Sequence, residues 1–146
     1  RSKTLGTKTD VEDGNWHHIG FVWKSVTEKY KGYVDGVLVG ESAVVTDYGG
    51  IGTPVIIGAR GDATTAYSDG LVDEVALYDR ALSDTEMTTL YNGGIASTPS
   101  STDLVSWWRM GDDGSDDHTS IVDQEAVSNI TAVGMFPASL VEDAPN

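Results

Sequence analysis

The sequence predicts an all-β protein, a two-sheet antiparallel sandwich of the jelly-roll type that carries one short helix. Three observations predict this class. Short runs of β-branched and aromatic residues, separated by turn residues, fill most of residues 1–100. The dipeptide Asp35-Gly36 lies between two such runs, which is a strong pattern for a hairpin. Helical periodicity is confined to residues 83–92, so the helix is an addition to a β structure.

The first predicted strand covers residues 16–23, which are rich in β-branched and aromatic side chains. Successive side chains of a strand point to opposite faces, so this strand has two distinct faces. One face is expected to carry Ile19, Phe21 and Trp23, and the other Trp16, His18 and Val22.

The following strands build the hairpin and its continuation. Residues 30–34 and 37–45 flank Asp35-Gly36, where a type I′ turn requires positive φ angles. A short apolar strand is predicted at residues 55–58 and a longer one at residues 70–79.

The predicted helix covers residues 83–92. Ser83 and Glu86 have the spacing of a capping box, in which each side chain accepts a hydrogen bond from the other residue's backbone N–H. Asp84 adds a negative charge where the helix dipole favours it. Gly93 suits the left-handed residue that ends a helix. We therefore expect a short helix docked on the sheet.

The last third of the chain differs in composition from the rest. Residues 101–146 carry nine Asp and Glu against one Arg, and residues 104–110 are predicted as a strand. A small polar stretch with one Pro precedes them and is typical of a linker. We therefore divide the chain into residues 1–94, a linker at 95–103 and a second segment, 104–146.

Length, charge and cysteine usage exclude several classes. The chain has 146 residues, about one domain, with a formal net charge of −14. This charge would repel nucleic acid and anionic membrane surfaces. No apolar run approaches the roughly 18 residues of a membrane span, so we expect no membrane insertion. The absence of cysteine excludes disulfides and thiolate metal sites.

The start of the sequence predicts a processed product or a piece of a larger protein. The chain begins with Arg1, and its first methionine is Met87. We therefore expect a homo-oligomer or a part of a larger assembly.

Four short segments follow one another in an order that is found in a known family. They are Asp13-Gly14-Asn15-Trp16-His17-His18-Ile19-Gly20, Tyr33-Val34-Asp35-Gly36, Val55-Ile56-Ile57-Gly58, and the run from Gly70 through Asp73-Glu74 to Arg80-Ala81-Leu82-Ser83. In these segments the chain resembles laminin-G-like jelly-roll domains of the concanavalin A-like lectin/glucanase superfamily. The resemblance covers residues 10–94 and implies a binding module.

The chain departs from this family pattern in two ways. Residues 1–94 resemble only the second half of such a domain. The run Leu104 to Asp112, with Ile121-Val122-Asp123 after it, is similar to the family's opening segment. Residues 104–146 therefore either return to the same sandwich as a permuted strand or begin another repeat. We favour the first, because 43 residues do not easily bury a core of their own.

Asp73 is the most informative polar residue. Strand alternation over residues 70–79 places it between Leu71 and Val75 on an apolar face. A carboxylate that faces inward costs several kcal/mol unless it is paired or bound to a metal. Two interpretations stay open: a carboxylate satisfied by backbone N–H groups or by an arginine, and a ligand of Ca²⁺, which takes oxygen ligands.

The family resemblance also implies a calcium site, one that joins the opening and closing segments. Asp112 and Asp123 would supply the further ligands to Asp73. Most acids of the loop at residues 112–117 are expected to be solvated, because no EF-hand spacing fits there.

Aromatic residues in or near loops are weak candidates for stacking on sugar rings. They are Tyr48, Tyr67 and Trp108, and ordinary packing is the favoured role for each. His17 and His18 are adjacent on a strand and point to opposite faces, so they cannot chelate one ion. In the family this pair is structural.

The sequence argues against an enzyme. Glycosidases need two carboxylates across a cleft, and the E-x-D-x-x-E strand of laminarinase-like relatives does not occur here. Asp73 and Glu74 are adjacent, so they would face opposite sides of a sheet.

We therefore predict a non-catalytic binding or structural module, located in a virion or outside the cell. In the first hypothesis it is part of a fibre or capsid decoration. It then contacts other virion or cell-surface proteins and attaches to cell-surface glycan. The segment Trp107 to Asp112 is similar to tails of structural proteins from marine bacteriophages. The alternative is a carbohydrate-binding, lectin-like module of a bacterial extracellular protein.

Overall fold

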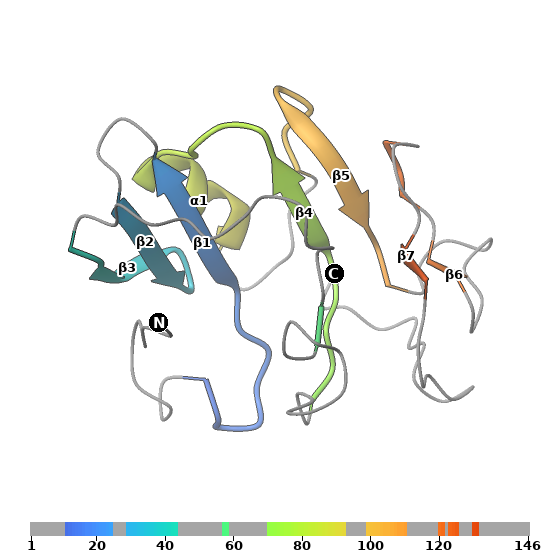
Figure 1. Cartoon of the computed structure of the whole chain (residues 1–146). Coiled ribbons are helices and arrows are strands. Elements are labelled where there is room, and N and C mark those ends of the chain that lie inside the picture. The colour runs from blue at the N-terminus through green and yellow to red at the C-terminus, as the bar shows by residue number, and fades with distance from the viewer. Residues whose placement is uncertain are drawn as a thin grey trace.

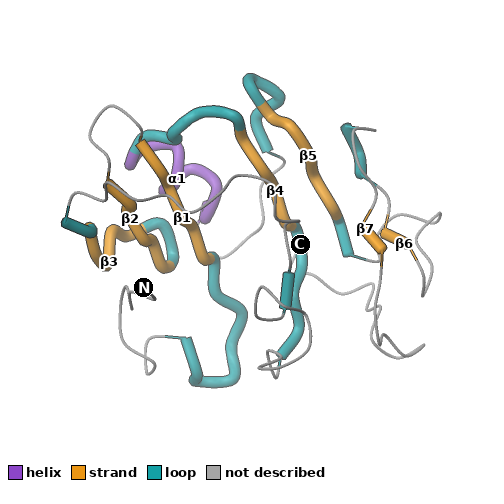
Figure 2. Tube along the Cα trace, in the orientation of Figure 1, coloured by secondary structure: helices purple, strands orange, loops and turns teal. Residues whose placement is uncertain are grey.

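The computed structural model contains short antiparallel sheets and one helix (Figures 1 and 2). It describes residues 11–24, 29–43, 57–58, 70–92, 99–110, 120–121, 123–125 and 130–131. The elements are β1 (Ile19–Lys24), β2 (Lys29–Val34), β3 (Val37–Glu41), β4 (Val75–Tyr78), α1 (Asp84–Tyr91), β5 (Leu104–Trp108), β6 (Ser120–Ile121) and β7 (Ile130–Thr131). The predicted class, antiparallel β structure with one short helix, is confirmed.

The predicted hairpin is present as the β2–β3 pair of a three-stranded sheet, β1-β2-β3. Its turn is Asp35-Gly36, with φ angles of 51° and 72°, as a type I′ turn requires. Strand β1 starts at Ile19 and not at Trp16. His18 instead contacts the hairpin turn: its N–H donates to the Asp35 carboxylate at 3.0 Å, and its carbonyl accepts from the Asp35 N–H at 2.9 Å.

Helix α1 covers one face of the three-stranded sheet. The buried side chains between them are Val22, Tyr33 and Met87, and Ala81, Leu82 and Leu90 pack against this cluster. Gly20 lies against the end of the Met87 side chain, and a Cβ at this position would collide with it. Within β1 the predicted alternation is confirmed, since Ile19 and Phe21 are exposed while Gly20 and Val22 are buried, whereas Trp16, predicted on the face of Val22, lies before the strand and is 43% exposed. The core therefore lies between the sheet and the helix.

The capping box of α1 is confirmed. The Ser83 hydroxyl accepts from the Glu86 N–H at 3.2 Å, and a Glu86 carboxylate oxygen accepts from the Ser83 N–H at 2.7 Å. At the other end Asn92, with φ of 44°, takes the left-handed position that the sequence assigned to Gly93. Asparagine tolerates this conformation better than most residues do. Gly93 lies outside the described residues.

We expect Ser83→Ala to lower the free energy of unfolding by about 1 kcal/mol, because the N-cap acceptor is lost. Urea denaturation measures the change. Thr89→Ala is the matched control, since its hydroxyl donates to a carbonyl inside the helix and caps nothing. Equal midpoints for Ser83→Ala and the unchanged chain would contradict the capping role.

The strand predicted at residues 70–79 is shorter than expected. Only Val75–Tyr78 is a strand, and residues 71–74 before it are irregular. Glu74 has a φ of 51°, which ends the extended conformation at that point. Of the strand predicted at 55–58, the structure describes residues 57 and 58, and these form a bend.

Strand β5 lies within the predicted strand 104–110 and pairs antiparallel with β4, from Val75↔Trp108 to Tyr78↔Leu104 (Figure 1). A strand of the second segment thus joins a strand of the first. The division at residues 94 and 104 stays a prediction. Within the part of the chain that the structure describes, no helix is both long and apolar enough to cross a membrane.

Candidate functional site

A groove of about 590 Å³ lies between the three-stranded sheet and the start of α1. This volume is within the roughly 300–1,000 Å³ usual for ligand sites. Its lining comes from β1, β2, the end of β3, the segment that leads into α1 and the first turn of α1. The lining residues are Val22, Lys24, Lys29, Lys31, Glu41, Ala81, Leu82, Ser83, Asp84, Thr85 and Glu86.

The groove combines an apolar part with charged groups. Val22, Ala81 and Leu82 line it and also belong to the core or pack against it, so this part of the wall is held in place. Three of the chain's nine basic residues line the same groove, together with three carboxylates.

The charged groups on the sheet side are paired in defined positions. Lys29 Nζ lies 2.6 Å from Glu41 Oε1, and Lys31 Nζ lies 2.7 Å from Asp84 Oδ1. The bond from Lys29 holds the pKa of Glu41 below its usual value. The bond to Asp84 raises the pKa of Lys31, and the same bond lowers that of Asp84. Glu41, Asp84 and Lys31 are therefore charged at neutral pH.

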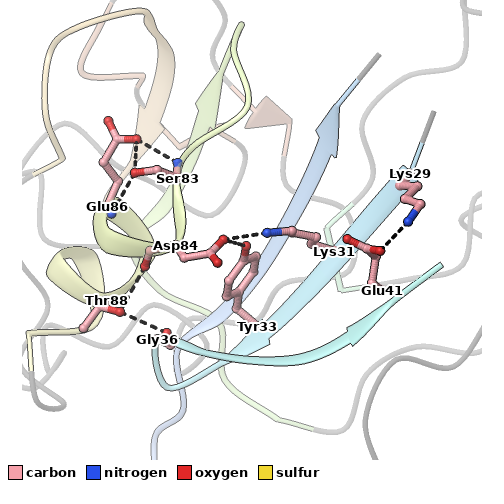
Figure 3. Close-up of polar contacts among 9 residues, drawn as sticks. All are labelled: Lys29, Lys31, Tyr33, Gly36, Glu41, Ser83, Asp84, Glu86 and Thr88. Carbon is pink, nitrogen blue, oxygen red and sulfur yellow. Dashed lines mark hydrogen bonds and ion pairs between the residues drawn. The ribbon is translucent and has the colours of Figure 1, made fainter. Parts of the chain in front are cut away.

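Asp84 also fixes the helix to the sheet. The buried Tyr33 hydroxyl donates to Asp84 Oδ1 at 2.6 Å, and burial raises the pKa of this tyrosine. Thr88, one turn later, donates from Oγ1 to the carbonyl of Gly36 at 3.2 Å. These contacts join residues more than 50 positions apart in the sequence and hold α1 against the sheet (Figure 3).

Glu86 is held from three directions. Arg80 Nη2 lies 2.6 Å from its Oε1, and the N–H and hydroxyl of Ser83 donate to its Oε2. The Arg80 bond is the main reason why the pKa of Glu86 falls to about 2. Arg80 also reaches Asp103 at 3.2 Å, so it links the helix start to the residues that enter β5.

His17 links the turn before β1 to the β2–β3 hairpin. Its Nδ1 lies 2.9 Å from Asp35 Oδ2 and its Nε2 lies 2.9 Å from Asp13 Oδ1. The Asp35 bond, followed by the Asp13 bond, raises the pKa of His17. The pKa of Asp13 falls to about 2, mainly through Asn15 and then through His17. Burial lowers the pKa of His18. These contacts give His17 a structural role.

We expect the stabilising effect of His17 to depend on pH. Its folded-state pKa is raised, so the effect is fully present below the unfolded value of about 6.5 and is lost as the pH rises through the folded value. At the acid end, the contribution of Asp13 is present above about 3.8 and is lost as the pH falls towards about 2. Chemical denaturation of the unchanged chain and of His17→Asn should therefore differ more at pH 5.5 than at pH 8.5. A difference that does not change with pH would contradict this account.

Asp73 is not inward-facing on a strand, which corrects the alternation argument. The strand starts after it, Leu71 is 59% exposed, and Asp73 itself is half-buried. Its Oδ1 accepts from the Glu74 N–H at 2.8 Å. A carboxylate satisfied by a backbone N–H was one of the two interpretations, and the described contact fits it.

Asp123 is buried, with 2% of its surface exposed. Its Oδ1 accepts from the backbone N–H groups of Trp107 at 2.9 Å and Glu125 at 3.0 Å. The calcium prediction also needs Asp112, which lies outside the described residues. Within the described ranges, no three His, Cys, Asp or Glu residues gather as a metal site would require. These residues do not by themselves form a calcium shell.

The calcium site with Asp73, Asp112 and Asp123 stays a prediction. Its test is thermal melting with calcium and with a chelator. The prediction expects the chelator to lower the melting temperature of the native chain but hardly that of Asp73→Asn, because an ion that binds the folded state stabilises it. Equal curves for the native chain would contradict it.

Of the three weak sugar-stacking candidates, the structure describes Trp108 alone. Its side chain is 4% exposed, so its indole packs in the interior and is not presented to a ligand. The cause is its central place, paired with Val75 on one side and bridged to Asp123 on the other. Tyr48 and Tyr67 lie outside the described residues.

A second surface is apolar. On β1, Ile19 is 48% and Phe21 72% exposed, and Val37 on β3, which like Ile19 is paired with Val34, is 64% exposed. The side chains of Ile19 and Phe21 point away from the face that α1 covers. This surface has no comparable set of fixed polar partners, so the groove is the better candidate for a specific ligand.

The groove lysines were not singled out by sequence reasoning. They are separated by more than 50 residues from the helix start that completes the groove. Lys29 and Lys31 alternate with Tyr30, so on a strand the two lysines lie on the same face. This alternation is the sequence pattern that could have indicated them.

Comparisons with known proteins give one family and two individual likenesses. The model of the "Concanavalin A-like lectin/glucanases superfamily" family matches residues 1–88. The human adhesion G-protein coupled receptor D1 is 34% identical over 83 residues, which are 55% of this chain and 9% of the receptor. A crystal structure of an S-layer domain-containing protein from Clostridium thermocellum is 27% identical, with a TM-score of 0.38 over 54% of this chain and 40% of that one. The chain thus spans less than half of each of these two proteins.

Proposed function

The chain belongs to the concanavalin A-like lectin/glucanases superfamily, and from this membership we propose that it is a non-catalytic adhesion module that binds a surface glycan outside the cell. The observation that carries the proposal is the groove between the sheet and α1, which joins an apolar wall to charged groups in fixed positions. The similarity to an adhesion receptor supports the same role.

The electrostatics of the groove favour binding over hydrolysis. A glycosidase needs one carboxyl group whose pKa is raised, so that it can act as an acid near neutral pH. The three carboxylates of the groove have lowered pKa values, because each has a lysine or arginine partner. They are Glu41, Asp84 and Glu86. Groups that stay ionised serve as hydrogen-bond acceptors for sugar hydroxyls.

We also propose that the chain is part of a larger assembly at the surface of a virion or of a cell. The resemblance of Trp107 to Asp112 to phage structural tails supports the virion setting. Immunogold labelling of purified particles tests it, with label expected on fibres or on the capsid surface. Absence of the polypeptide from every particle fraction would leave the cell-surface setting instead.

Binding is tested with the purified chain on immobilised polysaccharides and on whole bacterial cells. We expect saturable retention without release of reducing sugar over hours of incubation. Retention on neither kind of surface would contradict an adhesion role, and release of reducing sugar would contradict the non-catalytic one.

A further inference from the structure

We infer that the groove selects an uncharged polyol, a glycan without sulfate or uronate groups, over an anionic one. This inference rests on the proposed function and names the ligand class of the same site. It follows from the balance of charges in the lining and from the apolar wall beside them.

The charges of the lining balance. The lining contains three cations, Lys24, Lys29 and Lys31, and three anions, Glu41, Asp84 and Glu86. Two of the lysines are already bonded to carboxylates of the same groove, at 2.6 and 2.7 Å. An anionic ligand would have to compete with those carboxylates for the ammonium groups. It would also approach a chain with a net charge of −14, which repels it at long range.

A cationic ligand is attracted at long range by the net charge of −14, but it meets like charges inside the groove. Three ammonium groups line the space it would enter, and the carboxylates are engaged by lysine, by arginine and by the helix cap. An uncharged ligand meets neither penalty. Its hydroxyls can donate to the carboxylates and accept from the ammonium groups without breaking the pairs, because these ions have further hydrogen-bond positions.

The apolar wall indicates a second property of the ligand, an apolar face. Ala81 and Leu82 are partly buried and line the groove beside the charged groups, with the buried Val22 behind them, so the groove is amphipathic. A sugar ring has the same character, with C–H groups on its faces and hydroxyls around its rim. The pairs are fixed before binding, which reduces the entropic cost of ordering them around the ligand.

The test uses two tryptophan variants of exposed threonines on α1. Thr85 lines the groove, and Thr85→Trp would fill part of it. Thr89 lies one turn later, is also exposed and does not line the groove, so Thr89→Trp is the matched control. The probes are immobilised mannan and dextran as uncharged glycans, and heparin and alginate as anionic ones.

We expect the native chain to bind at least one uncharged probe, at least tenfold more tightly than either anionic probe. We expect this affinity to change less than twofold between 50 and 500 mM salt. Thr85→Trp should lose at least tenfold in affinity, while Thr89→Trp stays within twofold of the native chain. Circular dichroism checks that both variants fold.

Other outcomes overturn the inference in separable ways. Tighter binding to heparin or alginate, with an affinity that falls steeply with salt, would overturn the uncharged class and keep the adhesion role. Equal binding by the two variants would remove the groove as the site while leaving the proposed function intact. Binding to cells but to none of the four probes would overturn the inference alone. Binding to neither cells nor probes would overturn the proposed function itself.

Discussion

Replacing Asp123 by alanine is expected to lower the free energy of unfolding by about 2–5 kcal/mol. The carboxylate is 2% exposed and accepts from the backbone N–H groups of Trp107 and Glu125. Alanine leaves both groups without this acceptor, at a cost of about 1–3 kcal/mol for each buried one. Removal of a buried charge offsets part of the loss. Urea denaturation, followed by tryptophan fluorescence, measures the result.

Asp123→Asn is the matched control, because the amide oxygen can still accept the two hydrogen bonds. We expect it to lose less than half of what the alanine variant loses. Equal losses in the two variants would show that the negative charge matters more than the acceptor. That result would favour the calcium interpretation of Asp123 over the hydrogen-bonded one.

Gly36→Ala is expected to cost about 2–4 kcal/mol of unfolding free energy. The residue has a φ of 72°, where a Cβ costs about 1–2 kcal/mol. That Cβ would also lie 2.9 Å from Thr88 Cα and 3.2 Å from Tyr91 Cβ. Helix α1 would have to move away from the hairpin, and such overpacking typically costs about 1–3 kcal/mol. Thermal and urea denaturation both report the change.

Gly14→Ala separates the two contributions. Gly14 also has a positive φ, of 84°, but a Cβ there would meet nothing within 4 Å. We expect it to show the backbone cost alone and therefore a smaller loss than Gly36→Ala. If the two variants lost the same stability, the contact between the added Cβ of residue 36 and α1 would contribute nothing to the loss.

The elements that the sequence predicted correctly are those set by short-range chemistry. The Asp35-Gly36 turn needs only its own two φ angles, and the capping box needs only Ser83 and Glu86. The family motif around this turn, in contrast, has long-range explanations. In Tyr33-Val34-Asp35-Gly36, the tyrosine bonds to Asp84, the aspartate holds His17, and the glycine makes room for α1.

The elements that were not predicted depend on partners far along the chain. Glu74 leaves the strand conformation, and its carboxylate accepts from Trp107 Nε1 at 2.5 Å and lies 3.4 Å from Arg109 Nε. Alternation along residues 70–79 contains no information about these partners, so it placed Asp73 on the wrong kind of surface. The burial of Trp108 follows from its place between β4 and Asp123, which is also a long-range arrangement.

The groove also depends on contacts between residues that are far apart in the sequence. Its lysines follow from strand alternation, but the apolar wall and the carboxylates that balance them arrive with residues 81–86. The sequence therefore predicted the fold class, whereas the arrangement of charges in the groove required the packed structure.

The most direct test of the central claim, that the groove is the binding site, is an NMR titration of the ¹⁵N-labelled chain with an uncharged oligosaccharide from mannan. If the groove binds the glycan, the largest amide shift changes fall at residues 81–86 and at Lys29 and Lys31, with saturation at one ligand per chain. Changes confined to Val37, Leu38 and the other exposed apolar positions, with residues 81–86 unmoved, would contradict it.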